Sequence, residues 1–335
     1  MPTLSNTDNT VFAKNVAESV NSHLVFLSTQ KSCLNLNFSE IPRSSQILFP
    51  LAEILNNIMV KRHFILTFLL ISSFLLSQKS IFWKISKNGN DSYILGTYHY
   101  LGKDFFKDDE IIFNALKNSK VAYSENIDSA KAFINQRNQN LVLKKLNEKE
   151  FQTIKKIVPK YVDWNKMTIK ELIVTIDGKI TSKFCLSEKE KLDSIKLDDY
   201  LKEYSIKNKI QLLGLESTSK TFDYLNSNIY KDYDENKLLK ILEDKIQTLN
   251  SKEQNINCAI LQEYRTKKHN FNFSKESQQK MLTIRNKDWI NTIDKSIQEN
   301  KNIFIFVGLY HLDFKDGLLE LLKNRGYSVS PIELK

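Results

Sequence analysis

Glycine, proline and cysteine are all scarce in this 335-residue chain, which contains 8, 5 and 3 of them. So little glycine and proline excludes a collagen-like protein, and so few cysteines exclude a small scaffold held together by disulfides. Hydrophobic residues make up 41% of the chain and charged residues 26%, a composition that excludes a wholly disordered protein. The length favours one large or two small globular domains.

The chain also lacks the usual patterns of nucleic-acid and nucleotide binding. Lys and Arg number 49 against 39 Asp and Glu, which gives a net charge of +10. No basic cluster is interleaved with aromatic residues, however, and no zinc-finger or Walker spacing occurs. The lysines are spread along helix-like segments, where they are expected to form solvated faces. We therefore expect no nucleic-acid partner.

One apolar run, residues 64–76, follows Met59 and a short basic segment and precedes small polar residues. This order is typical of a secretory signal, and the run is shorter than the roughly 20 residues that a membrane-spanning helix needs. We interpret residues 1–58 as a disordered upstream over-extension, 59–77 as a signal peptide and 80–335 as the mature domain. The expected location is the periplasm or the exterior. Alternatively, the chain starts at Met1 and the run is a membrane anchor or a buried helix.

Export would change the interpretation of the cysteines. Removal of the leader would discard Cys33 and leave Cys185 and Cys258 in an oxidising compartment. A disulfide between these two residues and a pair of free buried thiols are both compatible with the sequence.

The hydrophobic patterns predict strands at both ends of the mature chain and helices between them. Such an order indicates an α/β (or α+β) fold, with a central mixed β-sheet built from N- and C-terminal strands and a large helical insertion. A hairpin is expected around the turn at 87–91, because an Asn-Gly pair separates two β-rich runs. The predicted strands are 80–85, 92–96, 121–125, 210–216, 303–308 and 327–334. The predicted helical segments are 108–118, 128–200, 218–259, 274–300 and 316–325, and Pro159 and Asp177-Gly178 are candidate breaks in the second of them.

Two of the five histidines occupy matching positions at the ends of predicted strands. His99 and His311 each lie three residues after a glycine, Gly96 or Gly308, within a shared G-x-Y-H-x-x-x-K-D pattern. We interpret the glycines as sites of a sharp backbone turn that delivers each imidazole beyond the carboxyl end of its strand, where α/β folds place ligands. Two imidazoles and one carboxylate would form a metal-dependent hydrolytic site. A single histidine at a strand end is more often structural, but two in matched contexts favour function.

Two glutamates could supply the carboxylate. Glu125 ends one predicted strand on the same face as Val121 and Tyr123, and Glu216 ends another. A carboxylate on an apolar face has to be paired or bind a metal. Arg285 is a candidate partner for either glutamate, or else a surface residue.

Two further patterns carry less weight. His269 lies in a Lys-rich segment and is expected to be solvated. No G-x-S-x-G motif is present, so serine hydrolase chemistry is not supported.

These motifs resemble those of the TraB/GumN family, whose relatives include the TIKI metalloproteases. The resemblance runs from about Phe82 to the C-terminus. It rests on the order of several short segments: Ile94-Leu-Gly-Thr-Tyr-His99, the strand-end Glu125, Leu197-Asp198, Leu213-Gly-Leu-Glu216, Arg285-Asn286 and Phe306-Val-Gly-Leu-Tyr-His311.

The resemblance implies an α/β fold and a metal-dependent hydrolase or peptidase site on the two histidines and a glutamate. We expect His99, His311 and Glu125 to hold a divalent ion (Mn, Co or Zn), with Glu125 or Glu216 as general base. Arg285 or Tyr310 would stabilise an oxyanion.

Two alternatives remain at this point. One is a non-catalytic protein of the envelope that binds a peptide, a metal or haem on the same scaffold. The other is a membrane-anchored factor that interacts with other envelope proteins and contacts the membrane only through an uncleaved 59–77 segment.

Overall fold

The computed structural model describes residues 79–335, except 141–143, 194, 254 and 301. The predicted over-extension at 1–58 and signal peptide at 59–77 therefore lie outside the described residues. Within the part of the chain that the structure describes, no helix has both the length and the apolar character needed to span a membrane.

The described residues form six strands, eleven α-helices and three short 3₁₀ helices. The strands are β1 (Phe82–Lys87), β2 (Asn90–Thr97), β3 (Val121–Ser124), β4 (Gln211–Gly214), β5 (Ile303–Gly308) and β6 (Ser328–Ile332). The first helices are η3 (Lys103–Phe106), α3 (Glu110–Lys117), α4 (Ala130–Asn135), α5 (Glu148–Ile157), η5 (Trp164–Lys166), α6 (Ile169–Cys185), α7 (Glu188–Leu192) and α8 (Leu197–Lys207). The later ones are α9 (Thr218–Asn228), α10 (Glu235–Asn250), α11 (Ala259–Arg265), α12 (Lys280–Asn300), η6 (Leu309–His311) and α13 (Leu318–Lys323).

All six strands belong to one sheet, in the order β4-β3-β5-β2-β1-β6. The neighbours β4, β3, β5 and β2 run parallel, whereas β1 pairs antiparallel with both β2 and β6. The predicted hairpin is present, with Asn88 and Gly89 both at positive φ in its two-residue turn. The predicted fold class, a mixed sheet with a helical region between its terminal strands, is confirmed.

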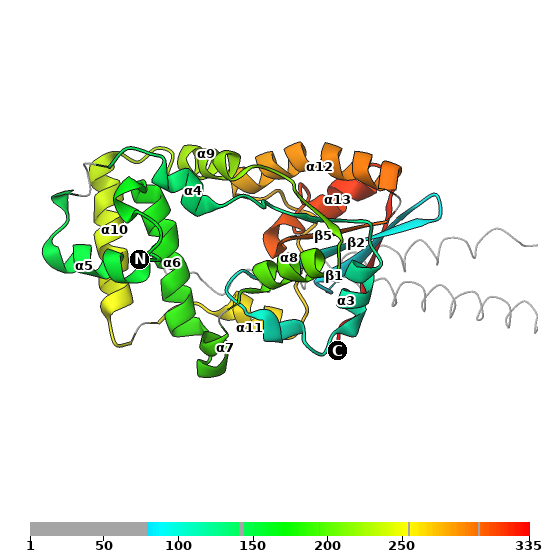
Figure 1. The fold of residues 1–335 in the computed structure, drawn as a ribbon, viewed down its shortest axis with the longest axis horizontal. Helices are drawn as coiled ribbons and strands as arrows, with labels where there is room; N and C mark the ends of the chain where they lie inside the picture. Colours follow the sequence, from blue (N-terminus) through cyan, green and yellow to red (C-terminus); the bar gives the residue numbers. More distant parts are fainter. Residues whose placement is uncertain (1–78, 141–143, 194, 254, 301) are drawn as a thin grey trace, which may run out of the picture. The chain divides into compact units, whose positions relative to one another are not determined.

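Helices cover both faces of the sheet, as Figure 1 shows. The continuous apolar run of β5 is buried throughout because its side chains alternate between these faces. Phe304 and Phe306 pack with residues of α3, α8 and α11, whereas Ile305 and Val307 pack with α12 and α13. The sheet is therefore the middle of three layers.

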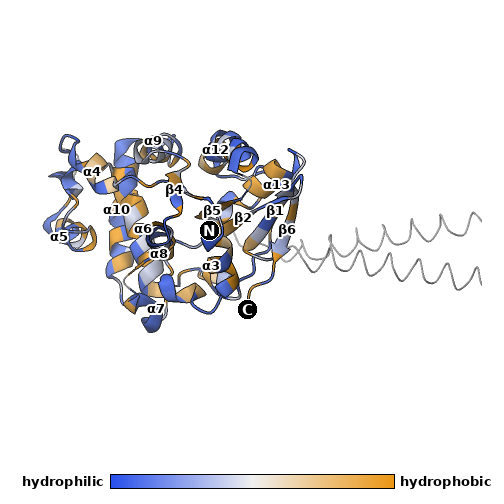
Figure 2. Cartoon of the chain, turned by 45° about the vertical axis from the view of Figure 1, so that its right-hand side comes forward, coloured by the Kyte–Doolittle hydropathy of each residue, from blue (hydrophilic) through white to orange (hydrophobic). Residues whose placement is uncertain are grey.

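The helical insertion has an apolar core of its own. Side chains from α4, α5, α6 and α10 form a separate buried cluster, and Figure 2 shows apolar and hydrophilic residues mixed along α10, as expected of an amphipathic helix. Capping boxes are present at Asn147 and Ser187, the residues that precede α5 and α7. Thr168 forms a third before α6.

Three predicted helical segments were too long. The segment 128–200 is divided into α4, α5, α6, α7 and the start of α8, with an interruption at Pro159 but none at Asp177-Gly178, which lie within α6. The segment 218–259 is divided into α9 and α10, because Tyr230 adopts positive φ and Asp234 caps the new helix at its N-terminus. The segment 274–300 becomes helical only at Lys280, after a loop whose backbone is bonded to side chains such as Asp316.

A disulfide joins Cys185, at the end of α6, to Cys258, the residue before α11. It therefore links the helical insertion to a helix that supports the sheet, since Tyr264 of α11 donates a buried hydrogen bond to the Gly96 carbonyl (2.7 Å). Of the two readings that the sequence left open, the structure contains the disulfide.

We predict that loss of this disulfide destabilises the fold. The two cysteines are 73 positions apart, and closure of a loop of that length stabilises a protein by about 4 kcal/mol through the entropy of the unfolded chain. Urea unfolding of the Cys185→Ser/Cys258→Ser variant should show this loss, and reduced wild-type protein should match the variant. Equal stability of oxidised and reduced protein would contradict the prediction.

Candidate active site

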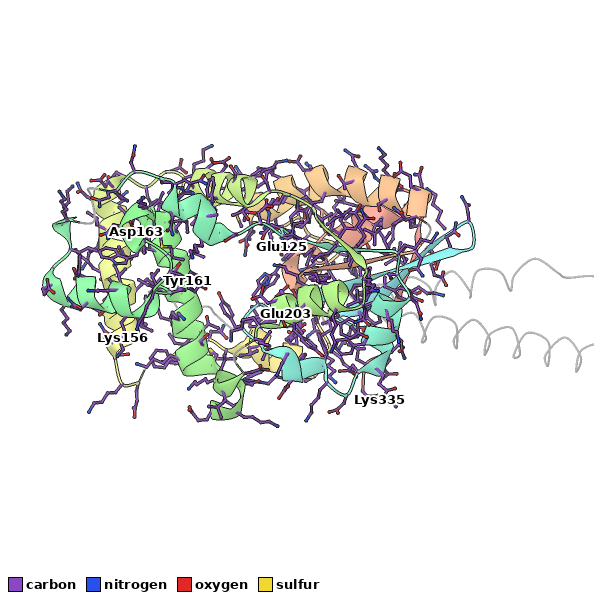
Figure 3. The ribbon with its side chains drawn as sticks, in the orientation of Figure 1. Glu125, Lys156, Tyr161, Asp163, Glu203 and Lys335 are labelled. Atoms are coloured by element: carbon purple, nitrogen blue, oxygen red, sulfur yellow. A yellow bond between two sulfur atoms is a disulfide. The ribbon has the colours of Figure 1, made fainter. Side chains whose placement is uncertain are left out.

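The candidate residues follow the carboxyl ends of the four parallel strands. His99 comes two residues after β2, Glu125 directly after β3, Glu216 two residues after β4 and His311 three residues after β5. Because these strands are parallel neighbours, their carboxyl ends meet at one edge of the sheet. Figure 3 shows Glu125 at the edge that faces the helical insertion.

Both imidazoles converge on a single carboxylate oxygen. Glu125 Oε1 lies 3.7 Å from His99 Nε2 and 3.8 Å from His311 Nε2. The same oxygen accepts a hydrogen bond of 2.8 Å from the backbone N–H of Gly308. The structure thus brings together two histidines that are more than two hundred positions apart in the sequence.

Gly308 is required for this convergence, although not for the reason that the sequence suggested. Its φ of −52° is open to any residue, so no sharp glycine turn exists there. A Cβ at this position would instead lie 2.9 Å from His99 Nε2 and 3.2 Å from Glu125 Oε1. A Cβ on Gly96 would similarly lie 2.8 Å from Leu309 Cδ1. The glycines of the repeated motif allow close packing rather than a turn.

His99 forms a pair with Asp198, in the first turn of α8. Its Nδ1 lies 2.9 Å from Asp198 Oδ2, and Thr97 Oγ1 donates to the other carboxylate oxygen at 2.7 Å. The negative charge of Asp198 raises the pKa of His99 to about 9, against the opposing effect of desolvation. His99 is therefore cationic at neutral pH, and about half of its side chain is exposed.

His311 has the opposite character. It is buried, its Nδ1 lies 2.7 Å from Asn286 Oδ1, and its ring packs 4.4 Å from the ring of Trp289. Burial lowers the pKa of His311 to about 3, and the neighbouring positive charges act in the same direction. His311 is therefore neutral at physiological pH.

Arg285 of α12 connects the acidic residues of the site. Its Nη2 lies 2.6 Å from Glu125 Oε2 and 2.8 Å from Glu216 Oε1, and its Nη1 lies 3.1 Å from His311 Nε2. Burial opposes the negative charge of Glu125, but the positive charge of Arg285 is among the influences that hold the pKa of this carboxyl well below its usual range. Arg285 is thus a buried partner of both glutamates and not a surface residue.

Glu216 lies behind Arg285 rather than beside the histidines. Besides Arg285, its carboxylate accepts hydrogen bonds from Trp289 Nε1 at 2.9 Å and Thr221 Oγ1 at 2.7 Å. No hydrogen bond or ion pair among the described residues joins it to His99 or His311. Of the two predicted glutamates, Glu125 alone contacts both imidazoles.

Tyr310 lies away from this cluster. Its ring packs 6.1 Å from that of His269, and burial raises the pKa of its hydroxyl to about 12. Within the described residues it makes no hydrogen bond to His99, Glu125 or His311. Of the two residues suggested for an oxyanion, Arg285 is therefore the one in the cluster.

The prediction that His269 is solvated was wrong. Only 6% of the residue is exposed, and its Nε2 lies 3.1 Å from Asp313 Oδ2. The neighbouring lysines suggested a surface loop, but the backbone N–H of His269 bonds to the Lys79 carbonyl and holds the loop beside the start of β1.

A family model described as the TraB/PrgY/gumN family matches residues 81–331. The chain belongs to this family. The matched range contains the six strands almost completely and every residue of the cluster, and it confirms the predicted TraB/GumN resemblance. No curated protein and no solved structure matches the chain.

Sequence reasoning assigned no role to three residues that the structure places in this TraB/PrgY/gumN site. Asp198 contacts His99, Asn286 contacts His311, and Trp289 contacts both Glu216 and the His311 ring. Asp198 and Asn286 belonged to segments that carried the family resemblance, which was the available signal. Trp289 follows Arg285 by one helical turn, and this spacing places both on one face of α12.

The cluster contains two imidazoles and a carboxylate, which are groups that can bind a divalent cation. Each histidine has an oxygen acceptor at Nδ1, the arrangement that usually orients an imidazole whose Nε2 binds a metal. Nevertheless, across residues 79–335 with the gaps given above, no three His, Cys, Asp or Glu side chains are grouped as a metal site. The contact of Arg285 Nη1 with His311 Nε2 would have to open for His311 to bind a metal.

We predict that the Asp198→Asn variant lowers the pKa of His99 from about 9 towards or below the ordinary value of 6.5, because the charge of Asp198 is the main cause of the shift. The pH dependence of stability follows from linkage. Because the pKa of His99 is higher in the folded than in the unfolded protein, its protonation stabilises the fold fully below about pH 6.5, and this stabilisation is lost as the pH rises through about 9. An NMR titration of the imidazole resonances measures the change.

The neighbouring Asp199→Asn variant is the matched control, since Asp199 is exposed and pairs with Lys202. It should leave the titration of His99 unchanged. An unshifted His99 in Asp198→Asn would contradict the assignment of Asp198 as its partner.

Proposed function

We propose that this TraB/PrgY/gumN protein is an exported hydrolase that depends on a divalent metal and cleaves peptide bonds. One observation carries the proposal: the Nε2 atoms of His99 and His311 face the same oxygen of Glu125, at 3.7 and 3.8 Å. Two imidazoles and a carboxylate at the carboxyl edge of a parallel sheet are a donor set suited to Mn, Co or Zn.

His99, His311 and Glu125 would hold the metal. When bound, such an ion would lower the pKa of a coordinated water from 15.7 to about 7 and so supply a nucleophile at neutral pH. Glu125 is suited to the role of ligand because it stays ionised, and the contact with Arg285 and the N–H of Gly308 fix its two oxygens. Of the two glutamates proposed as general base, Glu216 already accepts hydrogen bonds from Arg285, Trp289 and Thr221.

Arg285 is suited to oxyanion stabilisation. Its guanidinium has five N–H donors. Nε donates to Glu216, one N–H of Nη2 donates to Glu125, and one N–H of Nη1 is directed at His311, while Nη2 also forms an ion pair with Glu216. Among the described residues, the second N–H of Nη1 makes no hydrogen bond, so it would be available for the negative charge that develops on the substrate, in a buried setting where such a bond is strong.

One observation supports the proposed export. The Cys185–Cys258 disulfide is typical of proteins that fold in an oxidising compartment, which supports export to the periplasm or beyond. The preference for peptides rests on the resemblance to the TIKI metalloproteases alone.

A second candidate is a non-catalytic protein of the envelope that binds a peptide, metal or haem at the same site. The specific observation in its favour is the Arg285–His311 contact, which engages one of the two imidazole nitrogens that a catalytic metal would need. Binding without turnover would distinguish it.

We predict that the purified protein cleaves members of a fluorogenic peptide library, that a chelator abolishes this activity, and that Mn²⁺, Co²⁺ or Zn²⁺ restores it. His99→Ala, His311→Ala and Glu125→Gln should each lower kcat/KM by about 10³-fold or more, because each removes a proposed ligand. Metal content, measured by elemental analysis, should fall in the same variants.

The exposed Glu203→Gln variant on α8 is the control for Glu125→Gln and should retain full activity. Circular dichroism has to show that all variants are folded. Chelator-resistant cleavage, or metal binding without cleavage of any peptide tested, would reject the proposed hydrolase, and the second outcome would favour the binding protein.

A further inference from the structure

The side chain of Asn286 lies entirely within the protein, where each of its polar atoms has a partner. It is 1% exposed. Its Nδ2 donates to the backbone carbonyls of His311 at 3.2 Å and Asp316 at 3.0 Å, and its Oδ1 lies 2.7 Å from His311 Nδ1. One amide thus contacts both the ring and the backbone of His311.

The two carbonyl groups determine which way the amide faces. Carbonyl oxygens are acceptors only, so the atom that faces both of them has to be the NH₂ group of Asn286. The reverse orientation would place three oxygens together and leave them unsatisfied in a buried place, at a cost of about 1–3 kcal/mol for each lost partner. The oxygen of the amide therefore faces the imidazole.

This orientation also determines which ring nitrogen of His311 carries the proton. An amide oxygen accepts hydrogen bonds, so Nδ1 of His311 must be the N–H donor and Nε2 the atom with the lone pair. The contact on the other side of the ring agrees, since Arg285 Nη1 can only donate and lies 3.1 Å from Nε2. A proton on Nε2 would set two donors against each other.

We propose that Asn286 is a positioning residue that holds His311 as its Nδ1–H tautomer, so that Nε2 keeps the lone pair that accepts from Arg285 Nη1. The use of that lone pair as a metal ligand rests on the proposed function, but the tautomer does not. The role calls for Asn and not for Asp, because a carboxylate at this position would face the carbonyls of His311 and Asp316 with an oxygen. His99 is paired with an acid instead: Asp198 faces the imidazole with one oxygen and accepts from the Thr97 hydroxyl with the other.

A purely structural role for Asn286 has to be distinguished from positioning. Its two hydrogen bonds to carbonyls tie α12 to η6 and to the turn before α13, and their loss alone would destabilise the fold. The variants are therefore chosen to separate the two roles. Asn286→Asp keeps an acceptor for the imidazole and loses the donors, whereas Asn286→Ala loses both.

The experiment is long-range ¹H–¹⁵N NMR of the full-length, metal-free protein labelled at histidine, which reports the tautomer of each ring. Wild-type His311 is expected to be the Nδ1–H tautomer at neutral pH. Asn286→Asp should retain this tautomer despite lower stability. Asn286→Ala loses the acceptor at Nδ1 but keeps the Arg285 contact at Nε2, so it should populate the Nε2–H form beside the wild-type one. The exposed Asn291→Ala variant on the same helix should change neither property.

The inference is overturned if wild-type His311 is mainly the Nε2–H tautomer, or if a folded Asn286→Ala variant keeps the wild-type tautomer alone. If Asn286→Ala does not fold, the wild-type and Asn286→Asp spectra decide. A second measurement uses Co²⁺ alone: its affinity should fall about 10- to 100-fold in folded Asn286→Ala, as expected for loss of a residue that orients a ligand. Failure of wild-type protein to bind Co²⁺ would reject the proposed metal site and leave the tautomer result intact.

Discussion

The buried positive charge of Arg285 is the feature on which the rest of the site depends. Glu125 and Glu216 both lose most of their contact with water, and an isolated carboxylate in such a place would be strongly destabilising. The guanidinium contacts both, because its planar fork has donors in several directions. Removal of this one cation would leave two buried carboxylates without their main partner, so the geometry around His99 and His311 requires α12 to be packed in place.

The topology of the sheet converts distant sequence positions into neighbours. Because β4, β3, β5 and β2 lie side by side and parallel, whatever follows each strand lies at one edge. The helical insertion has its own core, and the disulfide joins it to the helix whose Tyr264 bonds to the end of β2. The candidate site therefore lies at the strand ends, and the insertion faces the edge of the sheet where they meet.

The repeated G-x-Y-H motif gives two histidines of different character. His99 is half exposed and paired with a carboxylate, whereas His311 is buried and bonded to a neutral amide. This difference does not arise from the motifs, which are alike, but from the helices packed over them, α8 for one and α12 for the other. An internal repeat in the sequence thus becomes an asymmetric site in the folded protein.

The sequence by itself determined the strands and the placement of His99, Glu125, Glu216 and His311 at their ends, because apolar runs and local turns are short-range signals. The order of its short motifs also indicated the family. Only the tertiary structure decided that Asp198 and Asn286 hold the two imidazoles, that Arg285 joins both glutamates, that Tyr310 lies elsewhere and that His269 is buried. These contacts join residues from 25 to 160 positions apart, and nothing in a local pattern specifies which helix covers which strand end.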